Sequence, residues 1–314
     1  MRAEPLLSIV IVNYNGLRFL DECIASIAAH VHCSHEVIVV DNASADDSVA
    51  HITRNFPHVR LIASAVNTGF TGGNNMGVRE ARGELVLLLN NDTKLLSPID
   101  AAVVAFDDAR LGALGVHLFY GDGRNQPSVG YEHTPLRILL SWLGLASVAV
   151  LPTVFRRTET SAAFYEQRHA DVVWVSGAFL LTRRTLWNAI GGLDERFFMY
   201  VEEVDYCKQV QLRGFRVAYL PDVRVCHYEG AGKAWIGRAA LTSTVRSYKL
   251  YLSKHYGDLV AHLTCAALAM VLWLRVPVYV ARQRLQGSTI AGEKAAGYAA
   301  AARQALTSLR GKRP

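Results

Sequence analysis

Acidic, amide and imidazole side chains follow several short apolar runs of this 314-residue chain. Residues 90–93 (NNDT) come directly after the apolar run at 84–89 (ELVLLL), which places Asp92 where a buried strand should end. Carboxylate oxygens are ligands that Mg²⁺ and Mn²⁺ prefer, and a cation held there could bridge a diphosphate. One carboxylate is a limited signal, because Asp92 could also cap the helix expected at 97–109.

Asp41 ends a second apolar run, at 37–40. A carboxylate in that place can accept a hydrogen bond from a ribose hydroxyl or a base N–H. Asp also favours caps and turns, so this simpler role stays open. Residues 67–77 (NTGFTGGNNMG) are rich in glycine and open an expected helix, whose N–H groups could face a phosphate. The alternative for this stretch is a turn with two glycines at positive φ.

Three carboxylates, those of Glu202, Glu203 and Asp205, lie at the start of an expected amphipathic helix. The helix dipole favours acids there by about 0.3–1 kcal/mol, which is a structural explanation for them. Like charges held together also raise the pKa of at least one carboxyl, which makes it a usable general base near neutral pH. His227 ends the run at 223–227. Such a histidine is often structural, but with Asp92 it would complete a metal site.

An α/β sheet must position these residues. The first 120 residues alternate between short β-branched runs and segments with apolar residues at 3.6 spacing, which is typical of a mostly parallel sheet with crossover helices. Ligands bind beyond the carboxyl ends of such strands, so we expect the polar clusters to converge on one crevice. The expected strands are 7–12, 36–40, 59–63, 84–89 and 111–119, and the expected helices are 18–31, 46–56, 72–82 and 97–109.

The pattern breaks at residues 120–170, which we interpret as an insertion or lid. Alternation resumes at 170–182, followed by a helix at 183–190, the helix from 202, and a strand pair at 215–220 and 223–228. The apolar content of 51% allows a sizeable core. Five cysteines without a CxxC pair argue against a disulfide framework or a zinc site and favour a reducing cytosol. The first residues lack the features of a signal peptide.

Positive charge gathers at the end of the chain. From Arg275 onward the net charge is +7, whereas the whole chain carries +6. The basic segment follows an apolar run at 259–274, which is short and contains His262, so a transmembrane helix is not favoured. Anionic headgroups attract such tails by about 1 kcal/mol per basic residue, so a membrane surface is a better partner than nucleic acid. The alternative is a terminal helix packed on the domain.

Seven segments in a consistent order, between about residues 7 and 230, carry a family resemblance. Together they resemble a family 2 glycosyltransferase of the GT-A fold, a Rossmann-like sheet flanked by helices, in the branch of bacterial rhamnosyltransferases. The segments are 8–16, 37–48, 67–77, 81–93, 174–185, 191–214 and the strand-end His227.

The resemblance implies an inverting hexosyltransferase that moves a sugar from a nucleotide diphosphosugar (dTDP or UDP), with Mg²⁺ or Mn²⁺. Rhamnose from dTDP-rhamnose is the favoured donor, and the acceptor would be a hydroxyl of a glycan or a lipid-linked molecule in cell-envelope polysaccharide synthesis. We expect a nucleotide-sugar half at 1–120 and an acceptor and catalytic half at 121–257. The tail at 258–314 would hold the enzyme peripherally on the cytoplasmic face of the cell membrane.

The resemblance also assigns roles to residues. Glu203 would be the catalytic base, and Asp92 and His227 would hold the metal. The donor would be bound by Tyr14, Asn15, Asp41, Asn67, Asn74 and Asn91, and the acceptor side would be lined by Trp174, Gly177, Glu202 and Asp205.

Two positions depart from the family pattern. Asn90 and Asn91 stand where further acids are common, which could alter metal preference, and Glu203 stands where Asp is usual, so its carboxylate reaches one methylene further. A rival interpretation is a catalytically silent sugar-nucleotide-binding or scaffold protein of the same fold. A nucleotidyltransferase is less favoured, because no basic triphosphate loop follows the first strand.

Overall fold

The computed structural model describes residues 4–143, 152, 155–228 and 237–307. The chain forms two compact units. Of the described residues, the first unit comprises 4–131, 158–195 and 203–228, and the second comprises 132–143, 152, 155–157, 196–202 and 237–307. The expected division into nucleotide-binding and acceptor-binding halves stays a prediction.

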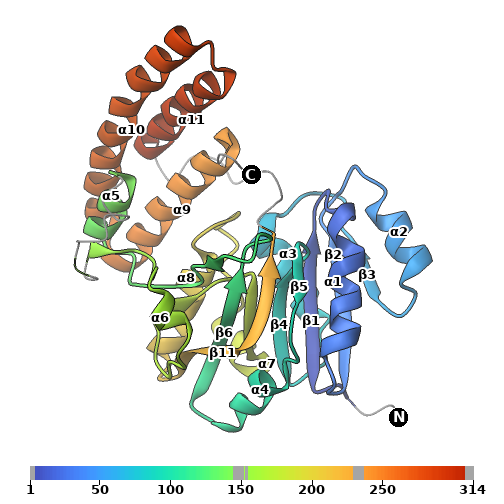
Figure 1. The fold of residues 1–314 in the computed structure, drawn as a ribbon. Coiled ribbons are helices and arrows are strands. Elements are labelled where there is room, and N and C mark those ends of the chain that lie inside the picture. Colours follow the sequence, from blue (N-terminus) through green and yellow to red (C-terminus); the bar gives the residue numbers. More distant parts are fainter. Residues whose placement is uncertain (1–3, 144–151, 153–154, 229–236, 308–314) are drawn as a thin grey trace. The chain divides into compact units, whose positions relative to one another are not determined.

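A mixed sheet forms the centre of the first unit (Figure 1). Within the described residues its strand order is β3-β2-β1-β4-β10-β6-β11-β5, and β7 pairs with β6. Strands β1 to β4 are parallel, as expected, whereas β10 runs antiparallel to both β4 and β6. The strands are β1 (Leu7–Asn13), β2 (His35–Asp41), β3 (Arg60–Ala63), β4 (Leu85–Asn90), β5 (Thr93–Leu95), β6 (Leu111–Phe119), β7 (Asn125–Gln126), β10 (Phe179–Arg183) and β11 (Arg216–His227).

Helices cover both faces of the sheet because successive side chains of β1 point to opposite sides. Ile9 and Ile11 join the core cluster that also contains the buried residues of α1 (Leu17–His30). Val10 and Val12 face α3 (Gly69–Arg79), where a Cβ on Gly77 would lie 2.3 Å from Val10 Cγ1. A Cβ on Gly73 would likewise lie 2.7 Å from Val12 Cγ1, so Gly73 and Gly77 allow α3 to pack closely on β1. Further helices are α2 (Ser48–Asn55), α4 (Asp100–Val104), α6 (Ala162–Tyr165), α7 (Arg184–Ile190) and α8 (Glu202–Leu212).

Several expected elements differ from the structure. The predicted strand pair at 215–220 and 223–228 is wrong, because β11 is one strand with a register shift between Leu220 and Arg224. Pro221, which cannot donate to a ladder, lies at this irregularity. The helix predicted at 97–109 is only α4 followed by a 3₁₀ turn at Ala105–Asp107. The turn with two positive-φ glycines at 67–77 is also wrong: only Gly69 in this stretch has φ of 75°.

The region interpreted as an insertion contains regular structure in its described part. Strand β8 (Val129–Gly130) pairs with β9 (Trp174–Val175), and the hydroxyl of Tyr165 accepts from the backbone N–H of Ser128 at 2.9 Å. The parts of this region that belong to the first unit, up to Tyr131 and from Thr158, are therefore held by short elements that periodicity could not predict. This region also contains an apolar stretch at 136–151, of which residues 144–151 lie outside the described residues.

Helices form the second unit: α5 (Pro135–Trp142), α9 (Arg238–Tyr256), α10 (Asp258–Gln286) and α11 (Thr289–Leu306). Buried Lys249 of α9 donates from Nζ to the carbonyls of Ala305, at 3.1 Å, and Thr307, where α11 ends. A cation is favoured at a helix C-terminus, so Lys249 joins α9 to α11. Helix α10 runs well past the apolar run at 259–274, and by length and composition alone it could cross a membrane.

Candidate active site

Asp92 and His227 meet at one edge of the sheet. The Oδ1 atom of Asp92 lies 3.3 Å from Nε2 of His227, and both side chains are almost fully buried. The short strand β5 explains this contact, because it pairs antiparallel with β11 and sets His227 opposite Thr93. The backbone N–H of Tyr228 also donates to the carbonyl of Asp92, at 2.9 Å. The cap alternative for Asp92 is wrong, since the N-cap of α4 is Ile99.

A chain of amide side chains joins the carboxyl ends of β1, β2 and β4. Asn13 donates from Nδ2 to Asp41 Oδ1 at 2.9 Å, and its Oδ1 accepts from Asn91 Nδ2 at 2.8 Å. Asn42 donates to Asn67 Oδ1 at 3.0 Å. The polar clusters that follow these strands therefore converge, as the parallel pattern predicted. Gly16 is needed beside them, since its Cβ would lie 2.0 Å from Asn91 Nδ2.

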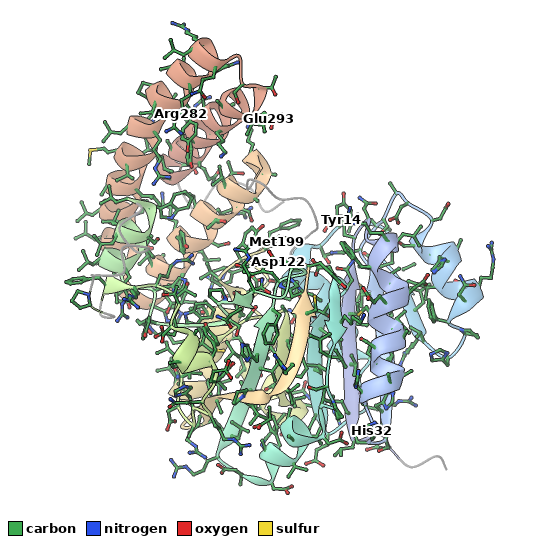
Figure 2. The ribbon with its side chains drawn as sticks, viewed as in Figure 1. Tyr14, His32, Asp122, Met199, Arg282 and Glu293 are labelled. Atoms are coloured by element: carbon green, nitrogen blue, oxygen red, sulfur yellow. The ribbon has the colours of Figure 1, made fainter. Side chains whose placement is uncertain are left out.

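The expected donor-binding residues differ in how much surface they present. Tyr14 is 52% exposed at the carboxyl edge, and Figure 2 shows it at the opposite end of the sheet from His32. Asn15 is exposed with φ of 50°, and its Oδ1 accepts from the backbone N–H of Ala45 at 2.7 Å. Asp41 is buried, and its Oδ2 accepts from the N–H of Ser44 at 3.0 Å, which supports the turn role. Its contact with a nucleotide stays a prediction.

The remaining two donor-side amides lie around the start of α3. Asn67 is exposed, and its Oδ1 also accepts from the N–H of Gly69 at 2.9 Å, which orders the first turn. Asn74 is buried inside the helix, where its Nδ2 donates to the carbonyl of Phe70 at 2.9 Å. Asn67 can reach a ligand directly, whereas Asn74 shapes the helix that would face one.

Glu203 lies on the same edge of the sheet as Asp92 and His227. A Cβ built on Gly177 would be 3.7 Å from Glu203 Cβ, and the next residue, Ala178, accepts through its carbonyl from the N–H of Asn90 at 3.1 Å. Glu203 therefore stands over the backbone that adjoins the carboxyl end of β4. The side chain of Glu203 is only half-buried, so it can meet a substrate.

Three of the residues expected on the acceptor side are more enclosed than Glu203. Glu202 and Asp205, the neighbouring acids of α8, are buried, and Glu202 falls in the second unit. Trp174 is buried too, and its indole N–H donates to the carbonyl of Tyr131 at 3.0 Å. Of the three carboxylates in the predicted cluster, Glu203 is thus the accessible one.

Comparison with known proteins identifies the family. Residues 8–184 match the sequence profile of glycosyl transferase family 2, which is more than half of the chain. The chain belongs to glycosyl transferase family 2.

Curated relatives of this family 2 member include glycan-assembling transferases. The N-acetylglucosaminyl-diphospho-decaprenol L-rhamnosyltransferase of Mycobacterium tuberculosis is 27% identical over 271 residues, covering 80% of this chain and 86% of the relative. The low-salt glycan biosynthesis hexosyltransferase of Haloferax volcanii is 26% identical, over 78% of this chain and 72% of the relative. The family 2 member therefore resembles rhamnosyltransferases.

Solved structures show the same fold. The mannosyltransferase PcManGT from Pyrobaculum calidifontis, in complex with GDP-Man and Mn²⁺, matches with a TM-score of 0.54 at 16% identity, over 97% of this chain and 88% of that one. GalNAc-T7 with UDP, GalNAc and Mn²⁺ matches with a TM-score of 0.60 at 14% identity, over 85% and 51%. The family 2 member has the GT-A fold, as the resemblance implied.

The structure adds residues to the site that the sequence did not single out. Gln126 of β7 is buried, and its Nε2 and Oε1 atoms lie 3.1 and 3.2 Å from Nδ1 of His227. Gln126 lies in the region without periodicity, so no pattern indicated it. Asn13 and Asn42 stand inside recognised motifs, and their position at strand ends could have marked them.

A polar cluster surrounds the hydroxyl of Tyr228, the residue that follows His227. Glu22 accepts from Lys94 Nζ at 2.6 Å and from the hydroxyl of Tyr228 at 2.7 Å. The hydrogen bond from Lys94, with that from Tyr228, lowers the pKa of Glu22. The bond to Glu22 in turn raises the pKa of Tyr228, with a further contribution from burial. Tyr228 stays a neutral donor, which fixes the backbone beside His227.

The atoms beside Asp92 fit a divalent cation. Two ligands at about 2.0–2.2 Å from one ion lie roughly 3 Å apart, close to the Asp92–His227 spacing. The Oδ1 atom of Asn90 is buried there and has no hydrogen-bond partner among the described residues. No group of three or more His, Cys, Asp or Glu suited to a metal occurs in this part of the chain. A cation would thus need ligands from a bound donor or water.

Proposed function

We propose that this family 2 glycosyltransferase is an inverting, divalent-cation-dependent enzyme that transfers a hexose from a nucleotide diphosphosugar to an acceptor hydroxyl. The observation that carries the proposal is the contact of Asp92 with His227 at 3.3 Å, on the edge where half-buried Glu203 also lies. A binding protein of the same fold would need no base beside its metal ligands.

The reaction follows from these positions as a single displacement. Glu203 takes the proton of the acceptor hydroxyl, whose oxygen attacks the anomeric carbon while the bond to the diphosphate oxygen breaks on the opposite side. Asp92 and His227 would hold Mg²⁺ or Mn²⁺, which offsets charge on the leaving diphosphate when bound. The amide chain from Asn13 to Asn91 keeps the strand ends in place, and exposed Tyr14 and Asn67 offer surface to the nucleoside.

The donor and acceptor are inferred from relatives. The rhamnosyltransferase named above supports L-rhamnose as the sugar and a lipid-linked diphosphate sugar as the acceptor. The dTDP carrier is proposed from the family resemblance alone. An acceptor of that kind lies in a membrane, so the enzyme would work peripherally on the cytoplasmic face. The exposed apolar side chains of α10 and the basic residues after Arg275 support this placement.

The test is release of nucleoside diphosphate from a panel of dTDP- and UDP-sugars, with Mg²⁺ or Mn²⁺ and a lipid extract as acceptor source. We expect Glu203→Gln to lower kcat by about 10²–10⁴ with donor affinity retained, because loss of a general base typically has that effect. Asp92→Ala should lose activity together with its response to the cation.

A matched control is Glu84→Gln, the same chemical change at an exposed position that precedes β4, at the far edge of the sheet. Glu84→Gln should keep kcat within about twofold of that of the unmutated enzyme. Near-normal turnover in Glu203→Gln would remove its role as the base. Donor binding without release in the unmutated enzyme, across the whole panel, would favour the silent binding protein instead.

A further inference from the structure

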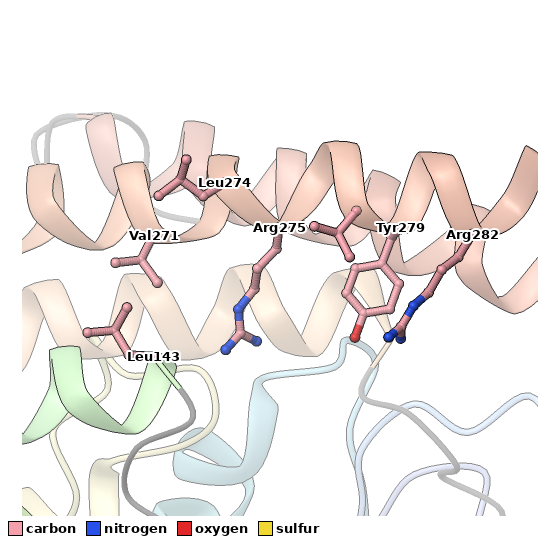
Figure 3. A pocket seen from close by; sticks show the side chains of 7 residues that line it. Leu143, Val271, Leu274, Arg275, Tyr279 and Arg282 are labelled. Carbon is pink, nitrogen blue, oxygen red and sulfur yellow. The ribbon is translucent and has the colours of Figure 1, made fainter.

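A groove of about 370 Å³ lies on the second unit, between the end of α5 and one side of α10 (Figure 3). Leu143, Val271, Leu274 and Val278 supply apolar walls. Figure 3 shows the side chains of Arg275, Tyr279 and Arg282 projecting from α10 on one side, as a spacing of three and four residues requires. The groove thus combines apolar surface with two guanidinium groups.

The two arginines that line this groove, and Lys294 beside it, form no ion pair with any residue that the structure describes. Arg275 is half-buried and donates from Nη1 to the hydroxyl of Tyr298, at 3.2 Å, and from Nη2 to the carbonyl of Trp142. It forms no ion pair with a described residue. Arg282 and Lys294 both lie over the ring of Tyr279, at 5.6 and 5.7 Å from its centroid, and neither pairs with a carboxylate in the described part of the chain. Guanidinium groups bind phosphate oxygens strongly in such partly dry places.

The apolar side of α10 continues far beyond the groove. Its exposed apolar residues recur at helical spacing along one side, over a helix of about 43 Å. They are Leu259, Leu263, Met270, Trp273, Leu274, Val278 and Leu285. The opposite side is buried within the unit, through Ala261, Cys265, Leu268 and Leu272 among others. A helix with one covered side and one apolar exposed side fits an interfacial position better than a free span.

We propose that this groove seats the phosphate headgroup of an anionic phospholipid, with the acyl chains along the apolar side of α10. The proposal deepens the peripheral membrane placement in the proposed function and rests on it. The charge complementarity of Arg275, Arg282 and Lys294 selects the anionic headgroup. The apolar side of α10 is long enough to contact many lipids at once. It therefore fits the surface of a bilayer better than a single bound lipid.

The test is binding of the full chain to vesicles of phosphatidylcholine with phosphatidylglycerol, measured by sedimentation. We expect Arg282→Gln to weaken binding more than tenfold, because it removes a seated phosphate contact. Leu274→Asn, at a highly exposed site, should weaken it as well. Phosphatidylcholine alone should bind at least tenfold less than the mixture. This assay needs no sugar nucleotide, cation or turnover, so a failed transferase assay leaves its result readable.

Matched variants separate the groove from general attraction. Arg284→Gln removes the same charge from α10 outside the groove and should weaken binding about fivefold or less, the effect of one basic residue near a surface. Leu212→Asn, an exposed leucine of α8, should have no effect. Equal losses of vesicle binding in Arg282→Gln and Arg284→Gln would overturn the assignment of the groove as the headgroup site. Tenfold tighter binding to vesicles carrying a polyprenyl phosphate at the same charge density would overturn the choice of a phospholipid.

Discussion

The orientation of His227 depends on groups that touch its ring. Gln126 contacts Nδ1 while Asn90 Nδ2 lies 3.1 Å from Nε2, on the side of Asp92. If Gln126 accepts the Nδ1 proton, the Nε2 lone pair is directed to the place where Asp92 would share a cation. Partners of this kind typically change metal affinity 10–100-fold.

We therefore predict that Gln126→Leu weakens Mn²⁺ binding in the presence of nucleoside diphosphate by about 10–100-fold, as measured by electron paramagnetic resonance. Gln126→Glu keeps an acceptor at the same reach and should stay within about threefold of the natural enzyme. Asp92→Ala serves as the variant without the carboxylate ligand. A Leu variant that binds Mn²⁺ as tightly as the natural enzyme would remove the positioning role of Gln126.

Single site residues could be predicted where they follow a predicted strand or begin a predicted helix. Asp92, His227 and Glu203 were all expected at one edge, and the structure brings the first two into contact. Gln126 could not be predicted, because its importance comes only from β7 pairing with β6 and from the fold of the chain around β11. Trp174 was expected on the acceptor side, but no sequence motif could predict its burial or its hydrogen bond to Tyr131.

At the scale of elements, strand β6 carries a buried histidine, His117, whose pKa differs between the folded and the unfolded chain. His117 stacks on Phe119, with ring centroids 4.2 Å apart, and its Nε2 lies 2.8 Å from Asn125 Oδ1. Burial lowers the pKa of His117, against an opposing effect of Asn125. The unfolded chain then takes up a proton more readily than the folded one as pH falls below the usual histidine pKa of about 6.5. Stability is full above that pH and decreases below it.

We predict that the free energy of unfolding falls between pH 8 and pH 5.5 by less in His117→Phe than in the natural protein, as measured by urea denaturation. One proton changes stability by at most about 1.4 kcal/mol per pH unit, which bounds the difference. His58→Phe replaces an exposed histidine and should keep the natural pH dependence. Parallel pH profiles for His117→Phe and the natural protein would contradict a buried neutral His117.

Elements with strong periodicity were predicted closely, and those set by pairing were not. The parallel strands β1 to β4 carry apolar runs that end at polar clusters, so both type and edge followed from the sequence. Strand β5 has only three residues, and it forms because it pairs antiparallel with β11, which is distant in sequence. A bulge near Pro221 and a turn there have the same local composition, so only the register along β6 distinguishes them.

On the scale of the whole molecule, the proposed donor site and the excess positive charge belong to different parts of the chain. Asp92, His227, Glu203 and the amides expected to bind the donor all lie in the first unit, whereas the basic residues from Arg275 onward lie in the second. A nucleotide that binds only the folded first unit should therefore stabilise that unit by mass action. A chain of this size with two units need not unfold in a single step.

We predict that UDP or dTDP with Mn²⁺, at 100 times its dissociation constant, stabilises the first unit by about 2.7 kcal/mol. At about 2–4 °C per kcal/mol, this raises its calorimetric transition by roughly 5–10 °C. The shift should shrink in EDTA and in Asp92→Ala, because the leaving diphosphate and the cation bind together. Arg282→Gln should keep the full shift, since it alters only the second unit. A shift of the same size in EDTA would contradict a nucleotide site built around Asp92 and a cation.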